Sequence, residues 1–380
     1  MLRTVKLRLL PTVEQEALFI QYVGTSRFIW NYFLKFQNDL YSSGQPYAST
    51  SEMGLMLKSL KEEYTWLSTI SHHTLLGAIR DLNEAFQLFF KGFNNSPKFK
   101  RKRCAKQSFY SRNDRFYITV DGDAHLDKIG VVKIKRDTNL PRGLKAISYK
   151  NVRVLRENNK WYVYVSIECE RKASQLNGVM GIDLGVRNFV TAYLNGNLKT
   201  YDYVTNTVKY NKYLRKQRHI IKVFYRKIRK HPDSVSHRQL RYDYILRRLK
   251  HRMQGLRREC LFNIVNDLCS LSPMYIVMEH LDKVSMQQTV TLRLRTALES
   301  VPFYNFKRLL KSKCDYLGIS LHEVSTYFPS TRKCSNCGTV LSHSLIGHDY
   351  ICKECNMIMD RDANAAINLS RALSVSKKVK

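Results

Sequence analysis

The sequence is short of acidic residues and of long apolar runs. Asp and Glu number 31 against 64 Lys and Arg, which leaves a net charge of +33. No apolar stretch approaches the roughly 20 residues that a membrane-spanning helix needs. The N-terminus, MLRTVKLRLLPT, alternates charged and apolar residues as a strand does, and it lacks the apolar core of a signal peptide. We therefore expect a cytoplasmic protein with no membrane partner.

The excess of positive charge indicates a polyanionic partner. Nucleic acid is the commonest polyanion, and an excess of 33 charges is larger than solubility alone requires. The 23 Tyr and 17 Phe include rings that could stack on unpaired bases, although we expect most of them in the core. At 380 residues, the chain can hold two or three domains, each with its own core.

Nine cysteines, an odd number, argue against a disulfide framework and favour a reducing cytosol. Four of them form two Cys-x-x-Cys pairs, Cys334 with Cys337 and Cys352 with Cys355. Four thiolates at this spacing fit tetrahedral Zn²⁺ and fill its coordination shell, so we expect one structural zinc ion.

The residues between and after these pairs bear on the same site. His343 and His348 lie between the pairs and are alternative ligands, although four cysteines suffice. Gly338 and Asn356 each follow the second cysteine of a pair, where such a turn often needs a residue that tolerates positive φ. This pattern strengthens the prediction of two zinc knuckles.

The first half of the chain reads as strand, helices, then strands. Residues 2–10 predict a strand, and Thr12 and Gln15 have the spacing of a capping box at the start of a helix. The helical pattern continues to about residue 90, and the basic run SPKFKRKRCAKQSF follows it. Short β-branched and aromatic runs between 108 and 170 predict strands of a small antiparallel barrel or sheet, which strand 2–10 could join.

The second half mixes apolar strands with basic helices. VMGIDLGVRNFVTAYLNGNLKTYDYV predicts three strands, and two long helices follow between 205 and 270. Asp233 and Asp243 are the only acids from 205 to 258. The first of these helices predicts a coiled-coil-like seam of Tyr210, Leu214, Gln217, Ile221, Phe224 and Ile228. MYIVMEHL and GISLHEVST predict further strands, with a helix near 303–316 between them.

Acidic residues stand at the ends of this second set of elements. Asp183 and Glu279 follow apolar strand residues, where an isolated ionised carboxylate is unfavourable unless it is paired or bound to metal. Asp362 lies where a helix begins, shortly after Asp360. Three converging carboxylates suit a pair of Mg²⁺ ions that hydrolyse a phosphodiester. Taken singly, Asp362 is also a candidate helix N-cap and Glu279 a candidate half of an ion pair.

Five motifs, taken in order, resemble the TnpB family of transposon-encoded, RNA-guided DNA endonucleases, relatives of the type V CRISPR effectors. The motifs are GIDLGVRNFVT, IVMEHL, STRKCSNCG, CKEC and DRDANAAINL. Upstream, SRFIWNYFL, DLNEAFQLFFKGFNNSPKFKRKR and WYVYVSIE resemble the N-terminal half of the family. The resemblance therefore covers most of the chain.

The resemblance implies a RuvC-like nuclease site. Asp183, Glu279 and Asp362 would be the catalytic acids and would bind two Mg²⁺ or Mn²⁺ ions, while Asp360 would be a helper or a helix cap. Two positions depart from the family. His280 stands where Asp or Asn is usual, and Asn356 where Gly is usual. His280 could change the pKa of Glu279 in a direction that the sequence leaves open.

The resemblance also implies a domain layout: an α/β, RNase H-like (RuvC) nuclease domain with an inserted zinc ribbon, preceded by a small β-barrel with a helical insertion. The parts are a first barrel strand (1–10), a helical recognition lobe (11–100), a wedge-like barrel (101–175), the nuclease core with its basic helix pair 205–270 (176–329), a zinc ribbon that binds target nucleic acid (330–358), a final nuclease helix (359–375) and a basic tail (376–380).

The partners implied are a guide RNA from the transposon end and double-stranded target DNA beside a short motif, in a prokaryotic, nucleoid-associated protein of unknown oligomeric state. The candidate nucleic-acid contacts are Lys98, Lys100, Arg101, Lys102, Arg103, Arg226, Lys227, Arg229 and Lys230. The main alternative is a nuclease-inactive repressor guided by RNA, which we would expect to lack at least one acid. A guide-independent nuclease and a transposase fit the order of motifs less well.

Overall fold

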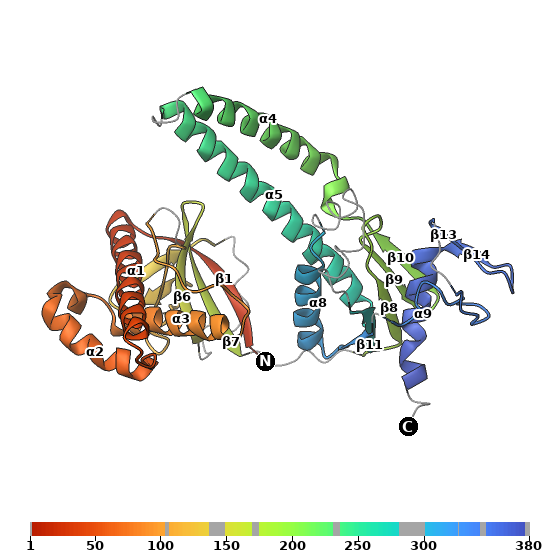
Figure 1. Ribbon diagram of the computed structural model, residues 1–380, viewed down its shortest axis with the longest axis horizontal. Helices are drawn as coiled ribbons and strands as arrows, with labels where there is room; N and C mark the ends of the chain where they lie inside the picture. Colours follow the sequence, from red (N-terminus) through yellow and green to blue (C-terminus); the bar gives the residue numbers. More distant parts are fainter. Residues whose placement is uncertain are drawn as a thin grey trace. The chain divides into compact units, whose positions relative to one another are not determined.

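The computed structural model describes residues 2–102, 106–136, 149–168, 175–230, 236–280, 301–325, 327–342 and 347–376. The chain divides into two compact units, Met1–Cys169 and Glu170–Lys380, and each has its own hydrophobic core (Figure 1). None of the helices formed by the described residues is long and apolar enough to cross a membrane.

A seven-stranded antiparallel sheet forms the centre of the first unit. Its strands lie in the order β2-β6-β7-β1-β5-β4-β3, with bounds β1 (Leu2–Leu10), β2 (Ser108–Tyr110), β3 (Tyr117–Ile118), β4 (Ala124–Leu126), β5 (Gly130–Ile134), β6 (Tyr149–Glu157) and β7 (Lys160–Glu168). As predicted, β1 joins the later strands, from Leu2 opposite Glu168 to Leu9 opposite Trp161. Among the described strands, β2 and β3 are edges that do not pair with each other, so closure into the expected barrel is not seen.

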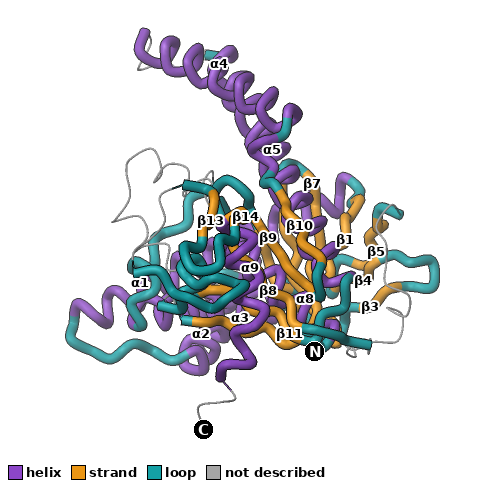
Figure 2. The backbone as a smooth tube through the Cα atoms, turned by 90° about the vertical axis from the view of Figure 1, so that its right-hand side faces the viewer, coloured by secondary structure: helices purple, strands orange, loops and turns teal. Residues whose placement is uncertain are grey.

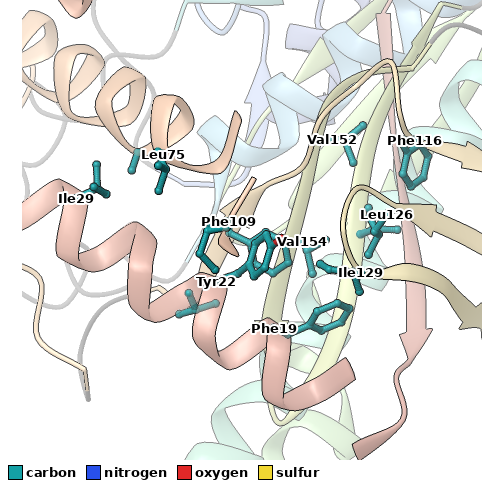
Figure 3. Close-up of a cluster of buried hydrophobic side chains, with 14 of the residues drawn as sticks. Phe19, Tyr22, Ile29, Leu75, Phe109, Phe116, Leu126, Ile129, Val152 and Val154 are labelled. Carbon is teal, nitrogen blue, oxygen red and sulfur yellow. The ribbon is translucent and has the colours of Figure 1, made fainter. Parts of the chain in front are cut away.

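Helices pack on this sheet through aromatic side chains. They are α1 (Val13–Ser42), α2 (Thr50–Glu63), the short 3₁₀ helix η1 (Thr65–Thr69) and α3 (His72–Phe90). The predicted capping box begins α1, because the Gln15 amide donates to Thr12 Oγ1 and the Thr12 amide donates to Gln15 Oε1. Figure 3 shows Phe19 and Tyr22 of α1 beside Phe109 of β2, with the rings of Tyr22 and Phe109 5.0 Å apart. The long helix is therefore anchored by buried rings.

A five-stranded mixed sheet forms the centre of the second unit. The order is β10-β9-β8-β11-β12, with bounds β8 (Val179–Asp183), β9 (Val190–Leu194), β10 (Asn197–Tyr201), β11 (Tyr275–Glu279) and β12 (Ser320–Val324). Strands β8, β11 and β12 are parallel, whereas β9 and β10 form an antiparallel hairpin beside them (Figure 2). The carboxyl ends of β8 and β11 consequently lie at the same edge.

Helices cover both faces of this second sheet. They are η3 (Val204–Asn206), α4 (Val208–Lys230), α5 (His237–Ser270), α8 (Phe303–Leu317) and α9 (Arg361–Ser376). Along β11, Ile276 and Met278 join the core built with α5 and α8, whereas Val277 packs with Leu369 and Ala372 of α9. Because neighbouring strand residues point to opposite faces, α9 lies on one face of the sheet and α5 and α8 lie on the other.

The basic helices α4 and α5 form a paired arm, visible in both Figure 1 and Figure 2. Ile220, Leu246 and Leu249 are the buried centre of their contact. Ile221 and Phe224 from the predicted seam pack against it, while Tyr210 and Leu214 join the core of the sheet instead. The predicted position Ile228 has no described side chain.

Candidate functional site

Two of the predicted acids end adjacent parallel strands. Met278 of β11 stands opposite Ile182 of β8, and Asp183 and Glu279 follow these two residues as the last of their strands. The residues before each acid are buried, which fixes both strands in the centre of the sheet. The two carboxyl groups therefore leave the same edge of the sheet, as the strand patterns predicted.

The third acid is brought there by a close approach between α9 and β8. A Cβ built on Gly181 would lie 2.0 Å from the carbonyl oxygen of Ala366 and 2.4 Å from the amide nitrogen of Ser370. Any side chain at Gly181 would therefore push the helix away from the strand. Ala365 and Ala366 of α9 are themselves fully buried. Small residues on both elements let the helix backbone rest on the strand.

Asp360 and Asp362 have different roles at the start of this helix. Asp360 ends β14 (Ile358–Asp360), and its Oδ1 accepts from the amides of Asp362, at 2.9 Å, and Ala363, at 3.1 Å. Asp360 is thus the helix cap, and the alternative that Asp362 serves as the N-cap is wrong. The Asp362 carboxylate is left facing Asn188, whose Nδ2 lies 3.4 Å from Asp362 Oδ2. Arg361 Nε lies 3.8 Å from its other oxygen.

The three acids act on one another electrostatically. Burial, followed by the negative charges of Asp362 and Glu279, raises the pKa of Asp183 to about 8, against a smaller opposing effect of Arg361. Burial also raises the pKa of Glu279, while a hydrogen bond from the Ser330 hydroxyl works in the other direction. The cluster thus gathers carboxylates whose negative charges repel one another with too little positive charge nearby to balance them. Its donors are all oxygen atoms, which suit hard divalent cations.

His280 is turned away from this cluster. Its Nδ1 lies 2.8 Å from Glu323 Oε2, and Lys307 donates to the same carboxylate oxygen. The pKa of Glu279 is set by burial and by Ser330. The possibility left open by the sequence, that His280 changes this pKa, therefore finds no support in the contacts of these residues.

The four cysteines form a compact cluster. Their sulfur atoms all lie within 4.8 Å of one another, with Cys334 Sγ 3.6 Å from Cys355 Sγ and Cys337 Sγ 3.5 Å from Cys352 Sγ. Zn–S bonds of about 2.3 Å in a tetrahedron place the sulfurs about 3.8 Å apart, so the cluster is consistent with a structural zinc. The described ranges contain no other group of three or more His, Cys, Asp or Glu residues that meets the same criterion for holding a metal ion.

The knuckle turns have the predicted backbone. Gly338 has φ of 84° and Asn356 has φ of 53°, so both adopt the left-handed conformation. The buried side chain of Tyr350 in β13 (Asp349–Ile351) packs against the cysteines and forms the small apolar core of the ribbon. Hydrogen bonds with Thr339 lower the pKa of Cys337 to about 6, which favours the thiolate that zinc needs. His348 is not part of the cluster, and His343 lies outside the described residues.

One side of α9 holds the ribbon in place. Asn364 Nδ2 donates to the carbonyl of Lys333 and its Oδ1 accepts from the amide of Ser335. Asn368 donates to the carbonyls of Ser330 and Lys333, and Arg371 donates to that of Ser335. The buried Ser330 in turn donates to Glu279. The loop before the first knuckle thus connects the zinc cluster, the last helix and the second acid.

The predicted nucleic-acid contacts are spread over both units. Lys98, Arg101 and Lys102 are exposed in the first unit, whereas Lys100 is partly buried. Arg226 is exposed on α4. Arg103 lies outside the described residues, and so do the side chains of Lys227, Arg229 and Lys230. Sequence reasoning missed Gly181, Asn188 and Ser330; only Gly181 carries a signal, since a glycine within a strand often marks a close backbone approach.

Comparisons with known proteins support one family. Residues 303–369 match the family model "Cas12f1-like, TNB domain", and residues 1–46, which fold as β1 and α1, match a "Helix-turn-helix domain" model of IS605 OrfB proteins. A Streptomyces pristinaespiralis protein named "Putative RNA-guided DNA endonuclease" is 27% identical over 97% of this chain and 89% of its own. Escherichia coli K12 InsQ, which bears the same name, is 24% identical over 98% and 92%.

A solved structure, a Cas12f1 complex with sgRNA and target DNA, has a similar fold. Its TM-score is 0.65 at 13% identity, over 97% of this chain and 98% of that one. The fold is therefore Cas12f-like, mixed α/β with a four-cysteine cluster. In both sequence and fold, the chain is thus similar to proteins of the TnpB (IS605 OrfB) family.

The ribbon predicts a zinc content that cysteine substitution removes. Purified full-length chain should contain about one zinc per molecule, and Cys352→Ser with Cys355→Ser should abolish it, as measured by elemental analysis. Because Asn364 and Asn368 hold the loop before the first knuckle, hydrogen exchange in α9 should also increase. Cys260→Ser, outside the cluster, should change neither. Zinc retained by the double variant would contradict the assignment.

The raised pKa of Asp183 predicts how stability depends on pH. The folded chain holds this proton up to about pH 8, whereas an unfolded Asp releases it near 3.8. Without divalent cations, the contribution of Asp183 to the free energy of unfolding should therefore fall by about 1.4 kcal/mol per pH unit between these two values. Above pH 8 it should level off. Asp183→Asn should unfold at a higher temperature than the unsubstituted chain at pH 8 and at nearly the same temperature near pH 4.

The exposed Asp315→Asn is the control for this comparison, because it removes one carboxyl from the same unit but outside the cluster. Its thermal midpoint should follow that of the unsubstituted chain at every pH. Added Mg²⁺ at pH 8 should stabilise the unsubstituted chain more than Asp183→Asn. Equal midpoints for Asp183→Asn and the unsubstituted chain across the range would show that the carboxyl of Asp183 ionises without resistance.

Proposed function

We propose that the chain is an RNA-guided DNA endonuclease that hydrolyses target phosphodiesters at the cluster of Asp183, Glu279 and Asp362. The observation that carries this proposal is the convergence of the three acids, two from the ends of adjacent parallel strands and one from the first turn of α9. The fold shared with the Cas12f1 complex and the names of the relatives agree with it. A RuvC-like, RNase H-like core for residues 176–329 with 359–375 is part of the same proposal.

The acids would hold two Mg²⁺ or Mn²⁺ ions. When bound, such ions would supply activation of a water molecule and stabilisation of the leaving oxygen of the phosphodiester. The protein residues supply the placement: Asn188 orients Asp362, and Ser330 orients Glu279. Bound cations would favour the ionised form of Asp183, because they would offset the negative charges of Asp362 and Glu279 that help to raise its pKa.

The proposed partners follow from charge and from the family. A guide RNA from the transposon end and a double-stranded DNA target beside a short motif would neutralise the excess of 33 positive charges. Pairing with the guide would read the target sequence, and the protein would hold the backbones. The helical lobe, the first-unit sheet and the arm of α4 and α5 offer the basic surfaces, and the ribbon 330–358 would bind target nucleic acid.

Substitution of each acid tests the nuclease. Asp183→Ala, Glu279→Ala and Asp362→Ala should each lower target cleavage by more than about 100-fold, since even residues that only support metal ligands cost 10–100-fold. Cleavage would be measured on a DNA duplex that matches the RNA copurified with the chain, with Mg²⁺ and with EDTA. RNA retention should be unchanged, because the basic surfaces bind it.

Asp360→Asn is the matched control, because an Asn carbonyl can still cap α9. It should cleave at close to the normal rate, whereas full cleavage by Asp362→Ala would show that the wrong aspartate was assigned. Target binding by the unsubstituted chain without cleavage in Mg²⁺ or Mn²⁺ would favour the RNA-guided repressor instead. Cleavage in excess EDTA would exclude the two-ion mechanism.

A further inference from the structure

The first unit contains a small basic cavity. Its volume is about 130 Å³, and it is lined by residues of α1, α3, β2 and β6 together with Lys100, Lys106 and Gln107. Val23, Ala78 and Phe109 supply apolar wall. The charged and polar residues that matter below are Ser26, Arg27, Asp81, Lys100, Lys106 and Arg153. Four cations and one carboxylate therefore share a space of a few atoms across.

The one carboxylate in this lining is already neutralised. Arg153 Nη2 lies 2.6 Å from Asp81 Oδ2, and Tyr110 OH donates to Asp81 Oδ1 at 3.2 Å. Arg153 also donates to Ser108 Oγ and to Tyr110 OH, so its guanidinium is fixed on several sides. This pair forms a rigid wall of the cavity and leaves the remaining positive charges uncompensated.

Two hydrogen bonds between the Asn31 side chain and the Lys100 backbone hold Lys100 in place at the cavity. Asn31 Nδ2 donates to the carbonyl of Lys100, and the Lys100 amide donates to Asn31 Oδ1 at 2.8 Å. The side chain is turned inward, with Nζ 3.3 Å from the centre of the Trp30 ring. No described carboxylate lies within ion-pair distance of it. Burial lowers the pKa of Lys100 to about 8, an effect that Asp81 offsets only in part and to which Arg153 adds.

Two neighbouring groups on α1 are also unsatisfied. Arg27 is half-buried and makes no hydrogen bond or ion pair with a described residue. Ser26 Oγ is buried without a hydrogen-bond partner. Buried polar groups are normally paired, so a set of donors left without acceptors points to a ligand that supplies them. Two cations and a hydroxyl match an anion with several oxygen atoms.

The size of the cavity limits what it can take. An engineered cavity of about 150 Å³ accepts a benzene ring, whereas sites for larger ligands run from roughly 300 Å³ upward. The space is thus sufficient for one phosphate group but not for a whole nucleotide. We propose that this cavity binds a single phosphate of a nucleic-acid backbone, through Arg27, Lys100 and Ser26, with Lys106 at its rim. The proposed function supplies the source, guide RNA or target DNA.

Inorganic phosphate tests the cavity by itself. Full-length chain freed of nucleic acid at high salt should gain thermal stability with added phosphate, measured against equal ionic strength of chloride. Arg27→Gln with Lys100→Gln should lose most of this gain. Lys98→Gln with Arg101→Gln removes the same charge from exposed positions of the same region and should retain it. An equal gain in both double variants would overturn the proposal in favour of general binding to the basic surface.

A conservative variant separates binding from folding. Lys100→Arg keeps the charge and the contact with Trp30, so it should fold as the unsubstituted chain does and retain part of the phosphate effect. If Arg27→Gln with Lys100→Gln does not fold, the graded series Arg27→Gln alone, Lys100→Gln alone and Lys100→Arg decides. Folded single variants with an undiminished phosphate effect would again exclude the cavity.

The source of the phosphate is distinguished with the two nucleic acids. Affinity for the copurified RNA, and affinity of the RNA complex for target duplex, would be measured over a salt series. Loss of one backbone contact should lower the slope of log K against log salt by about 0.7 for a single strand or 0.9 for a duplex. Arg27→Gln with Lys100→Gln should show this smaller slope for either the RNA or the target duplex. Lys98→Gln with Arg101→Gln should not show it for that same nucleic acid.

The outcomes keep this site apart from the nuclease. Slopes unchanged for both nucleic acids would overturn the phosphate site even if cleavage is normal. Loss of cleavage in the acid variants with normal phosphate binding would support both proposals. An inactive unsubstituted chain that still shows the phosphate effect would reject the nuclease and leave the cavity in place.

Discussion

The close packing of α9 on β8 is the constraint on which the second unit depends. Gly181 leaves room for the backbone of α9, with the Ala366 carbonyl and the Ser370 amide where a side chain would otherwise stand. This contact brings the first turn of the helix, and with it Asp362, to the carboxyl end of β8. On its other side the same helix holds the loop before the first zinc knuckle through Asn364 and Asn368. One helix therefore positions both the third acid and the ribbon.

This arrangement explains why a metal knuckle directly precedes an acidic helix. The ribbon returns to the sheet through β14, whose last residue, Asp360, caps α9. The loop that enters the ribbon supplies Ser330, which contacts Glu279. The segment that enters the ribbon thus contacts Glu279, and the segment that leaves it caps α9, the helix that carries Asp362. A zinc ion bound by the four cysteines would therefore also fix these two ends, although the cysteines lie outside the oxygen-donor cluster.

Sequence patterns predicted the parts of this structure that depend on local chemistry. The spacing of the four cysteines, the left-handed turns at Gly338 and Asn356 and the capping box of α1 are set by a few neighbouring residues. Periodicity and apolar runs likewise located β1 and the strands that carry Asp183 and Glu279. These features could be predicted because the relevant interactions lie within a few residues or within one element.

Features that depend on contacts between distant segments were not predicted. The sequence offered both Asp360 and Asp362 as possible caps of α9, and the choice between them depends on where the carboxylates point once the helix lies on the sheet. The Ser330 contact joins residues 51 apart. The expected closure of a barrel depended on an edge pairing that the described strands do not make. Lys100 reads as one charge in a basic run, but Asn31 and Trp30 turn it inward.

Each unit gathers charges of one sign without enough opposite charge nearby, negative in the second unit and positive in the first. In the second unit, carboxylates are gathered closely enough to raise the pKa of Asp183, and cations would relieve their repulsion. In the first unit, Lys100 and Arg27 line a cavity whose only carboxylate is already paired, and an anion would relieve them. Each arrangement is less stable empty than filled, so binding at either would stabilise the folded chain. Under the two proposals, the chain would therefore be most stable with divalent cations at the acids and a phosphate in the cavity.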